Sequence, residues 1–395
     1  MTIRRLLQSI LRTTWKRPEK CQAIQFGGLE VTALSLLADE FRIGVMPLLG
    51  ERISIPVVIR MISRLRVSKW AYYQTFIQLT AARVVLVWQE TNADAFQLRY
   101  HIRIPVFCIQ NGMRHNVGPV SGVGFIDALQ KISPSTRPTA DAYFCFGAAE
   151  PSYFGGVIET RFIPHGSLRA NAYAKRRMTM PTPVQGLGFI VSFPSRQSIP
   201  GESIIGNKSP FLRLGDQFIS YEDYYRFDAL VATAIRQVSS ERGLDFKIIA
   251  KRSEETSSEV QFFQDVLGDG VEVLAHVKGE GYELADRFEY LVTVDSAMGY
   301  EMRALGKPVA FIANRMKYLG IPCRDLTFGF PLPIDSEGPY WSSAISEPEI
   351  RSFLHRWLQS QVHHQIREDV FDLMRLDPGN SQLRGMIRLA LAEPR

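Results

Sequence analysis

The stretch 288–313 constrains the fold of this chain most, because its pattern predicts a strand, a helix and a second strand in direct succession. The mostly apolar run at 291–294 is typical of a fully buried parallel strand. Asp295 and Ser296 end that strand, and either side chain could cap the start of a helix. The Gly-Lys-Pro sequence at 306–308 ends the helix, and another apolar strand follows. These features predict a parallel βαβ unit.

The turn between the first strand and the helix is suited to a ligand. In an open parallel sheet such a turn lies at the carboxyl edge, where ligands bind. The N–H groups and positive dipole end of the helix favour a phosphate. Glu301 follows in the second helical turn, where its carboxylate could accept two hydroxyl hydrogen bonds from a ribose. The pattern also fits an ordinary βαβ unit, with Asp295 or Ser296 as a simple cap and Glu301 in solvent.

Length and composition indicate a two-domain globular protein. A chain of 395 residues exceeds one ordinary core, and 46% hydrophobic with 22% charged residues is a globular composition. No run of 18 apolar residues occurs, so we expect no membrane span. The cysteines are widely spaced, which predicts buried thiols in a reducing, cytoplasmic compartment and neither disulfides nor a metal site: Cys21, Cys108, Cys145 and Cys323.

The N-terminal segment 1–20 carries most of the net charge. Six basic residues against Glu19 give +5 of the total +6. An apolar stripe runs through the segment, so it predicts a basic amphipathic helix. Such a helix could lie on an anionic inner-membrane surface as a peripheral anchor, or pack on the first domain with a solvated basic face. We expect no nucleic-acid partner, because stacking aromatic residues are not interleaved with the basic ones.

Residues 21–169 predict a Rossmann-like first lobe, because strands and helical tracts alternate. The helical tracts include 29–40 and 57–65, and the strands are expected at 23–26, 42–46, 84–88, 106–110, 142–146 and 161–163. Two strand ends carry polar clusters. One is Gln89-Glu90-Thr91-Asn92, and the other runs from Gln110 through Asn111, Gly112 and Arg114 to His115. Both should lie at one carboxyl edge of the sheet.

A basic linker at 170–186 precedes a second Rossmann-like lobe at 187–345. Its first strand, 187–193, should be followed by a long loop at 194–220, and helices at 347–359 and 361–376 should close the chain within 346–395. Lys251 and Arg252 follow a strand at 246–250, where they could pair with a phosphate or form a solvated basic turn.

Two such lobes, a basic crossing segment and a phosphate-suited helix start describe the GT-B glycosyltransferase architecture, an α/β fold whose parallel sheets face each other across a cleft. The sequence resembles the bacterial surface-carbohydrate biosynthesis proteins of lipopolysaccharide and capsule assembly. The matching stretches extend over nearly the whole chain: IQNGMR (109–114), AYFCFG, PHGSLRANAY (164–173), IIAKRS (248–253), GYELAD (281–286), VDSAMGYEMRALGKPVAF and GPYWSS (338–343). The Asp-Ser-x-x-Gly-Tyr-Glu block is the most specific. A more distant likeness extends to transferases that use CMP-Kdo or CDP-glycerol.

The resemblance implies metal-independent transfer of a sugar from a nucleotide-sugar donor, which is a substrate and no cofactor, to a surface glycan or its lipid-linked precursor. It assigns the nucleotide to His165, Gly166, Ser167, Lys251, Arg252, Asp295, Ser296 and Glu301. Gln110, Asn111 and Arg114 would position the acceptor. Glu90 is the expected base, with His115 second, although the pattern of the resemblance has an Asp-Asn pair where this chain has Gln89-Glu90-Thr91-Asn92.

Three alternatives stay open at this point: a nucleotide-sugar 2-epimerase, a polyol-phosphate transferase of the same architecture, and a non-catalytic scaffold. CMP, UDP and GDP all remain candidates for the donor nucleotide.

Overall fold

The computed structural model divides the chain into two compact units. Unit 1 comprises Met1–Gly112, Ala128–Arg176 and Asp372–Arg395, and unit 2 comprises Met113–Asp127 and Arg177–Phe371. The residues described are 13–28, 33–49, 51–88, 93–112, 129, 137–177, 184–191, 211–214, 217–250, 258–268, 270–275, 281–320, 337–360 and 373–393.

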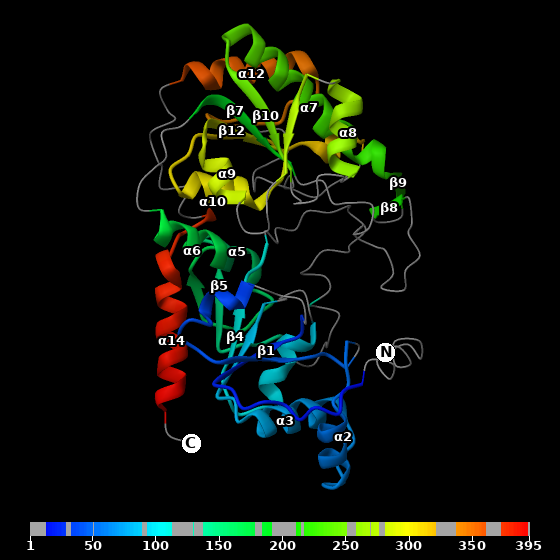
Figure 1. Ribbon diagram of the computed structural model, residues 1–395, viewed down its shortest axis with the longest axis vertical. Helices are drawn as coiled ribbons and strands as arrows, with labels where there is room; N and C mark the ends of the chain where they lie inside the picture. Colours follow the sequence, from blue (N-terminus) through cyan, green and yellow to red (C-terminus); the bar gives the residue numbers. More distant parts are fainter. Residues whose placement is uncertain are drawn as a thin grey trace. The chain divides into compact units, whose positions relative to one another are not determined.

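Unit 1 contains a parallel six-stranded sheet with the order β2-β1-β3-β4-β5-β6 (Figure 1). The strands are β1 (Ala23–Phe26), β2 (Ile43–Met46), β3 (Val84–Val87), β4 (Val106–Ile109), β5 (Ala142–Cys145) and β6 (Phe162–Pro164). All six are short and mostly apolar, with β1, β3, β4 and β5 buried along their whole length. The chain runs from β1 outward to β2 and returns to the other side of β1, so the strand order reverses between β1 and β3.

Helices cover this sheet. They are η1 (Ala33–Leu37), α2 (Ile55–Ile62), α3 (Lys69–Thr80), η2 (Ala93–Tyr100), α5 (Glu150–Phe154), α6 (Leu168–Arg176), η4 (Pro378–Asn380) and α14 (Ser381–Ala392). Of the helix predicted at 29–40, the part 33–37 is a 3-10 helix, and 29–32 lie outside the described residues.

Helix α14 belongs to unit 1 although it ends the chain, and Figure 1 shows it running along that unit. Leu383 and Ile387 are fully buried in one cluster with Val84 and Leu86 of β3. Burying each such side chain stabilises the fold by about 1.5–3 kcal/mol. Helix α14 was not predicted from the sequence. The last helix was expected at 361–376, which lies mainly outside the described residues. The available signal was apolar residues at helical spacing after Pro378.

Unit 2 contains a second parallel six-stranded sheet, with the order β11-β10-β7-β12-β13-β14. Its strands are β7 (Val184–Ile190), β10 (Asp245–Ile249), β11 (Glu272–Leu274), β12 (Phe288–Thr293), β13 (Val309–Ile312) and β14 (Trp341–Ser342). In chain sequence this is the order 3-2-1-4-5-6 of the dinucleotide-binding fold, and it reverses between β7 and β12. The prediction of two separate Rossmann-like sheets is confirmed.

The helices of unit 2 are α7 (Tyr221–Arg242), α8 (Ser258–Leu267), α9 (Gly281–Asp286), α10 (Ala297–Ala304), α11 (Arg315–Tyr318) and α12 (Glu347–Gln359). The prediction of a loop throughout 194–220 is wrong in its last part. There β8 (Phe211–Leu214) and β9 (Gln217–Ser220) form an antiparallel hairpin. The sequence at 211–212 and 218–219 is rich in residue types of high strand propensity, a local signal that the composition of the whole segment 194–220 had concealed.

Candidate functional site

The point of strand-order reversal in unit 2 lies beside the turn from β12 into α10. Thr293 fixes this turn, because its hydroxyl donates to the carbonyl of Ile190 at the end of β7 at 2.8 Å and accepts from the Ser296 amide at 3.2 Å. Ser296 has extended backbone angles and is the residue before the first helical turn, but its hydroxyl makes no capping hydrogen bond. The start of α10 therefore lies where an open α/β sheet binds its ligand.

A glycine holds α10 close to the sheet. A Cβ added at Gly299 would lie 2.6 Å from Cγ2 of Thr293 and 3.1 Å from the ring of Phe311 on β13. The next residue, Tyr300, packs its ring 4.6 Å from the Phe311 ring, measured between centroids. The Asp-Ser-x-x-Gly-Tyr sequence thus fixes the helix axis against β12 and β13.

Asp295 belongs to a buried ion cluster under this turn. Arg315, at the start of α11, donates a hydrogen bond from Nη1 to Oδ2 of Asp295. Its Nη2 donates to both carboxylate oxygens of Asp228 on α7, at 2.9 and 2.7 Å. The guanidinium also lies 4.5 Å from the ring centroid of Tyr224, whose hydroxyl accepts from Nη1 at 3.1 Å. The cluster therefore joins the β12–α10 turn, the start of α11 and helix α7.

The charges of this cluster do not balance, since two carboxylates surround one guanidinium. Burial raises the pKa of Asp228 to about 6, with Arg315 opposing that rise and Asp295 adding to it. Burial lowers the pKa of Arg315, but the two carboxylates outweigh it and hold the pKa above its usual value. Asp295 Oδ1 is buried and makes no hydrogen bond to any residue in the described part of the chain. Asp295 is therefore more than the simple cap that the sequence allowed.

Glu301 lies on α10 with 6% of its surface exposed, so the alternative of a solvated carboxylate is wrong. Its Oε2 accepts a hydrogen bond of 2.7 Å from the hydroxyl of Tyr282 on α9. This contact joins the GYELAD stretch to the block that follows it. The role of Glu301 toward a ribose stays a prediction.

The far ends of α9 and α10 are held by a second buried ion cluster. Lys307 donates to the carbonyl of Asp286 at 2.8 Å and lies 3.6 Å from its carboxylate. Arg177 donates to the same carboxylate at 2.7 Å. Burial lowers the pKa of Lys307, and Asp286 opposes that shift. The Gly-Lys pair that ends the block therefore positions α10.

In unit 1 the strand order reverses between β1 and β3. Gly27 and Gly28 follow β1 with φ of +75° and +73°, a conformation that favours glycine. The amide of Gln25 donates to both glycine carbonyls, at 2.8 and 2.9 Å, and Glu51 accepts from the Gly28 amide at 3.0 Å. This turn at Gly27 and Gly28 was not predicted from the sequence. The signal was a Gly-Gly pair directly after the first strand.

Of the predicted acceptor residues, Gln110 is completely buried and Asn111 is exposed. The Gln110 amide donates to the Gly112 carbonyl at 3.0 Å and accepts from the Phe146 amide at 2.8 Å. Gln110 therefore fixes the ends of β4 and β5. Its predicted part in acceptor binding is left untested by these contacts.

The His165-Gly166-Ser167 stretch lies inside unit 1 against the last segment of the chain. The His165 ring is 0% exposed, and its Nε2 lies 3.5 Å from Oδ2 of Asp377. Asn171 donates to the His165 carbonyl and to Asn380 Oδ1, both at 2.9 Å. A Cβ on Gly166, whose φ is +81°, would lie 2.4 Å from a backbone oxygen. The stretch joins the chain end to unit 1, and its predicted contact with a nucleotide stays a prediction.

Five predicted site residues lie outside the described residues: Glu90, Arg114, His115, Lys251 and Arg252. The strands before them are described. β3 ends at Val87, beside the reversal point of unit 1, and β10 ends at Ile249, next to β7 in unit 2.

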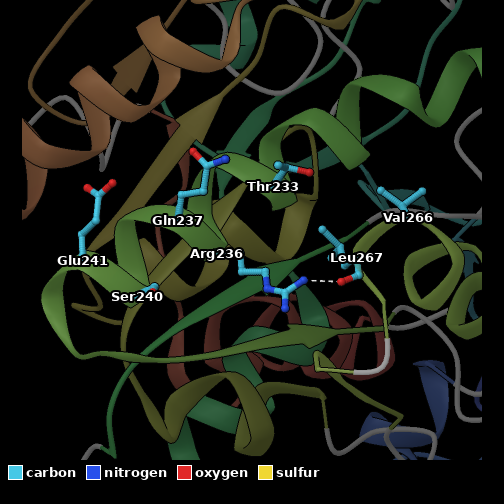
Figure 2. Close-up of a pocket in the computed structure, with 7 residues that line it drawn as sticks. All are labelled: Thr233, Arg236, Gln237, Ser240, Glu241, Val266 and Leu267. Atoms are coloured by element: carbon cyan, nitrogen blue, oxygen red, sulfur yellow. Dashed lines mark hydrogen bonds between the residues drawn. The ribbon is translucent and has the colours of Figure 1, made fainter.

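A separate hollow of about 450 Å³ lies in unit 2, and Figure 2 shows the residues that line it. Its lining comes from α7 and the end of α8, and Arg236 donates to the Leu267 carbonyl across it. These helix ends lead into β10 and β11, so the hollow lies toward the amino edge of the sheet. Ligands of open α/β sheets bind at the opposite edge, and we assign no ligand to it.

Three further observations concern only the described residues. No group of three or more His, Cys, Asp or Glu side chains there is placed to hold a metal ion. No helix in that part of the chain has both the length and the apolar character to cross a membrane. The described cysteines Cys21, Cys108 and Cys145 are buried thiols that form no disulfide with one another.

Comparison with solved structures identifies the fold. A variant of the wall teichoic acid polymerase TagF superposes with a TM-score of 0.50 at 12% identity, over 94% of this chain and 89% of that one. The S. aureus MnaA–UDP co-structure gives 0.51 at 10% identity, over 94% and 96%. A structure from Listeria monocytogenes, described as a "putative UDP-N-acetylglucosamine 2-epimerase", gives the same values. No curated protein sequence matches.

The two parallel six-stranded sheets and these matches define the GT-B fold, with two Rossmann-like lobes. A family described as "putative O-antigen biosynthesis protein" matches residues 107–390. The chain belongs to this family, which confirms the expected place in surface-carbohydrate biosynthesis.

Proposed function

We propose that this protein transfers a sugar from a nucleotide-activated donor to a surface polysaccharide or its lipid-linked precursor. The observation that carries the proposal is the start of α10 at the reversal point of the unit 2 sheet, with Ser296 making no capping bond. Membership of the chain in an O-antigen biosynthesis family supports the same proposal. The cytoplasm as the place of reaction is part of the proposal.

The donor would bind through its phosphates at the start of α10. Backbone N–H groups of the first helical turn and the Ser296 hydroxyl can donate to phosphate oxygens, and the helix dipole favours their charge. Arg315 offsets the charge of Asp295 next to this position. Lys251 and Arg252, close in sequence to the end of β10, would add positive charge, and Glu301 would accept from ribose hydroxyls.

In the proposed reaction an acceptor hydroxyl attacks the anomeric carbon while the bond from that carbon to the leaving phosphate oxygen breaks. The hydroxyl proton passes to a base of unit 1, with Glu90 first and His115 second. Positive groups aimed at the leaving phosphate stabilise the charge that develops there. No bound metal is part of this scheme, so excess EDTA should leave turnover unchanged.

Nucleotide binding provides the first test. Melting of the purified protein would be followed with CMP, CDP, UDP and GDP, because a ligand that binds only the folded state raises the melting temperature. We expect one nucleotide to stabilise the protein selectively, by about 2.7 kcal/mol at a concentration 100 times its Kd. No stabilisation by any of the four would contradict the proposal and favour a scaffold.

The second candidate is a nucleotide-sugar 2-epimerase, which the structural match to a protein described as a "putative UDP-N-acetylglucosamine 2-epimerase" favours. Incubation of the protein with a sugar donor of the stabilising nucleotide, without any acceptor, separates the two activities. An epimerase converts the sugar without an acceptor, whereas a transferase leaves its configuration unchanged. Transfer from a CDP-linked polyol in place of a sugar would instead show a polyol-phosphate transferase.

A further inference from the structure

Apolar side chains are exposed at one edge of unit 1, on α2 and the turn after it. We define the apolar ridge as Ile59, Ile62, Leu65 and Val67, which are 58%, 54%, 93% and 79% exposed. Only nine large hydrophobic residues are exposed in the described part of the chain, and these four occur within nine consecutive positions. Figure 1 shows α2 beside α3 at the periphery of the unit. Such a concentration indicates an interaction surface.

The fold does not require the ridge. Val57 and Met61, four residues apart on one face of α2, are buried and attach the helix to the unit. Ile59 and Ile62 lie on the outward face. Leu65 has φ of +55°, a left-handed conformation that leucine rarely adopts, and it is the most exposed of the four. Asparagine or glycine would suit this position better for folding alone.

Basic residues surround the ridge. Arg60, Arg64 and Arg66 alternate with its apolar side chains and are exposed. Between 52 and 69 the sequence contains five basic residues and no acidic one. Lys69, the last of them, pairs with Asp94 at 2.7 Å. The surface is therefore both apolar and strongly cationic.

Another exposed apolar side chain lies near the start of α2. The backbone of Thr14 pairs with Ile53 and Ile55, which places Trp15 beside the start of α2. The Trp15 side chain is 76% exposed. A cavity of about 340 Å³ near the start of α2 has both apolar and charged residues in its lining, and the charged ones are five basic residues and one acidic residue: Lys16, Arg17, Lys20, Arg42, Arg52 and Glu19. Tryptophan favours the membrane–water interface, and a basic hollow of this kind suits a phosphate group.

We propose that the apolar ridge and its basic surroundings dock on an anionic lipid bilayer. Apolar side chains enter the boundary between headgroups and acyl chains, and the guanidinium groups stay among lipid phosphates. A second copy of this chain fits less well, because a two-fold contact would oppose identical basic surfaces. This inference is independent of the proposed activity and of residues 1–12.

The test is flotation of the full chain with vesicles. Neutral phosphatidylcholine vesicles are compared with vesicles containing 30% phosphatidylglycerol, on the order of the anionic content that gives basic surfaces a measurable attraction. Wild-type protein should bind only the anionic vesicles and be released by salt. Leu65→Asn with Val67→Ser should lower binding at least about tenfold and leave the melting temperature equal or higher, since the strained leucine is removed.

Leu389→Ser is the matched control, because Leu389 is 68% exposed on α14, away from the ridge, and its replacement should leave binding unchanged. Arg60→Gln with Arg66→Gln should weaken binding and reduce its salt dependence. The proposal is overturned if wild-type protein binds no vesicles or binds both kinds equally. It is also overturned if the Leu65 and Val67 substitutions leave binding intact while substitution of the arginines within 1–12 abolishes it.

Discussion

Glu301 is a carboxylate that the fold keeps buried, with one oxygen oriented by the hydroxyl of Tyr282 at 2.7 Å. A buried carboxylate with this support is suited to accept hydroxyl hydrogen bonds, because its orientation is set before a ligand arrives. It lies one helical turn from the point where we propose the phosphates bind. The residue therefore allows the donor site to be tested without altering the phosphate contacts.

Replacement of Glu301 by Gln should weaken nucleotide binding by about 1–3 kcal/mol, because two charge-assisted hydrogen bonds become neutral ones or are lost. Titration calorimetry with the stabilising nucleotide measures this change. Tyr282→Phe is the matched control, since it removes the orienting hydroxyl and keeps the carboxylate, and we expect a smaller loss. Unchanged affinity in Glu301→Gln with an intact fold would refute the ribose assignment.

His165 should make unit 1 less stable in acid. Burial lowers its pKa below the usual value of 6.5, and Asp377 and the Gly166 carbonyl only partly oppose this shift. In the unfolded chain the ring takes up a proton near pH 6.5, whereas in the folded protein it does so only at lower pH. The stability from the neutral buried ring is therefore complete above pH 6.5 and is lost as the pH falls through the folded pKa.

Urea unfolding at pH 7.5 and pH 5.5 measures this effect. The difference between the two pH values should be smaller in His165→Gln than in wild-type protein, because the glutamine does not titrate. Comparing the two proteins cancels the contribution of other groups. An equal difference in both would show that folding does not lower the pKa of His165.

At the scale of elements, α10 depends on Gly299 for its distance from the sheet. Ala at this position places a methyl group 2.6 Å from Thr293 Cγ2, so the helix must shift. We expect Gly299→Ala to destabilise unit 2 by about 1–3 kcal/mol, as overpacking does elsewhere. Nucleotide binding should weaken as well, since the start of α10 moves with the helix. Chemical denaturation and the thermal-shift panel measure both effects.

Gly385 provides the matched control within α14. It is also a glycine inside a helix, but a Cβ there has no atom within 4 Å. Gly385→Ala should therefore stabilise the protein by up to about 1 kcal/mol through helix propensity alone. Stabilisation by Gly299→Ala of the same size would show that α10 can move without cost.

At the scale of the whole molecule, the two units should contribute different functions to one reaction. The base is expected in unit 1 after β3, and the donor site in unit 2 at α10. Glu90→Gln keeps the shape of the side chain and removes its basicity. It should lower turnover by about 10²–10⁴ and leave nucleotide affinity unchanged. Turnover with donor and acceptor, measured beside nucleotide titration, separates the two effects, and near-normal turnover would transfer the role to His115.

Local sequence patterns were enough to predict the individual units of this fold. Apolar runs such as 291–294, turn residues such as Asp295 and Ser296, and the Gly-Lys-Pro stop at 306–308 act on their immediate neighbours, so the βαβ unit and the two Rossmann-like lobes could be predicted. The position of Ser296 at the carboxyl edge followed from the same local pattern, because strand and helix order fixes that edge. The strand propensity of β8 and β9 is also a local signal, although the polar, Gly/Ser/Pro-rich composition of 194–220 as a whole predicts a loop.

Which polar residues are buried together depends on tertiary packing and could not be predicted from local patterns. Arg315 meets Asp228 across 87 positions of the chain, and Asn171 meets Asn380 across 209. No spacing within one segment specifies such a pair, because each partner is brought in by the packing of a different element. The same reason explains why Gln110 and His165, which the sequence placed at a ligand, form hydrogen bonds inside unit 1, and why α14 returns to the lobe in which the chain began. Local preference fixes an element, but burial of polar groups is set by elements that meet only after folding.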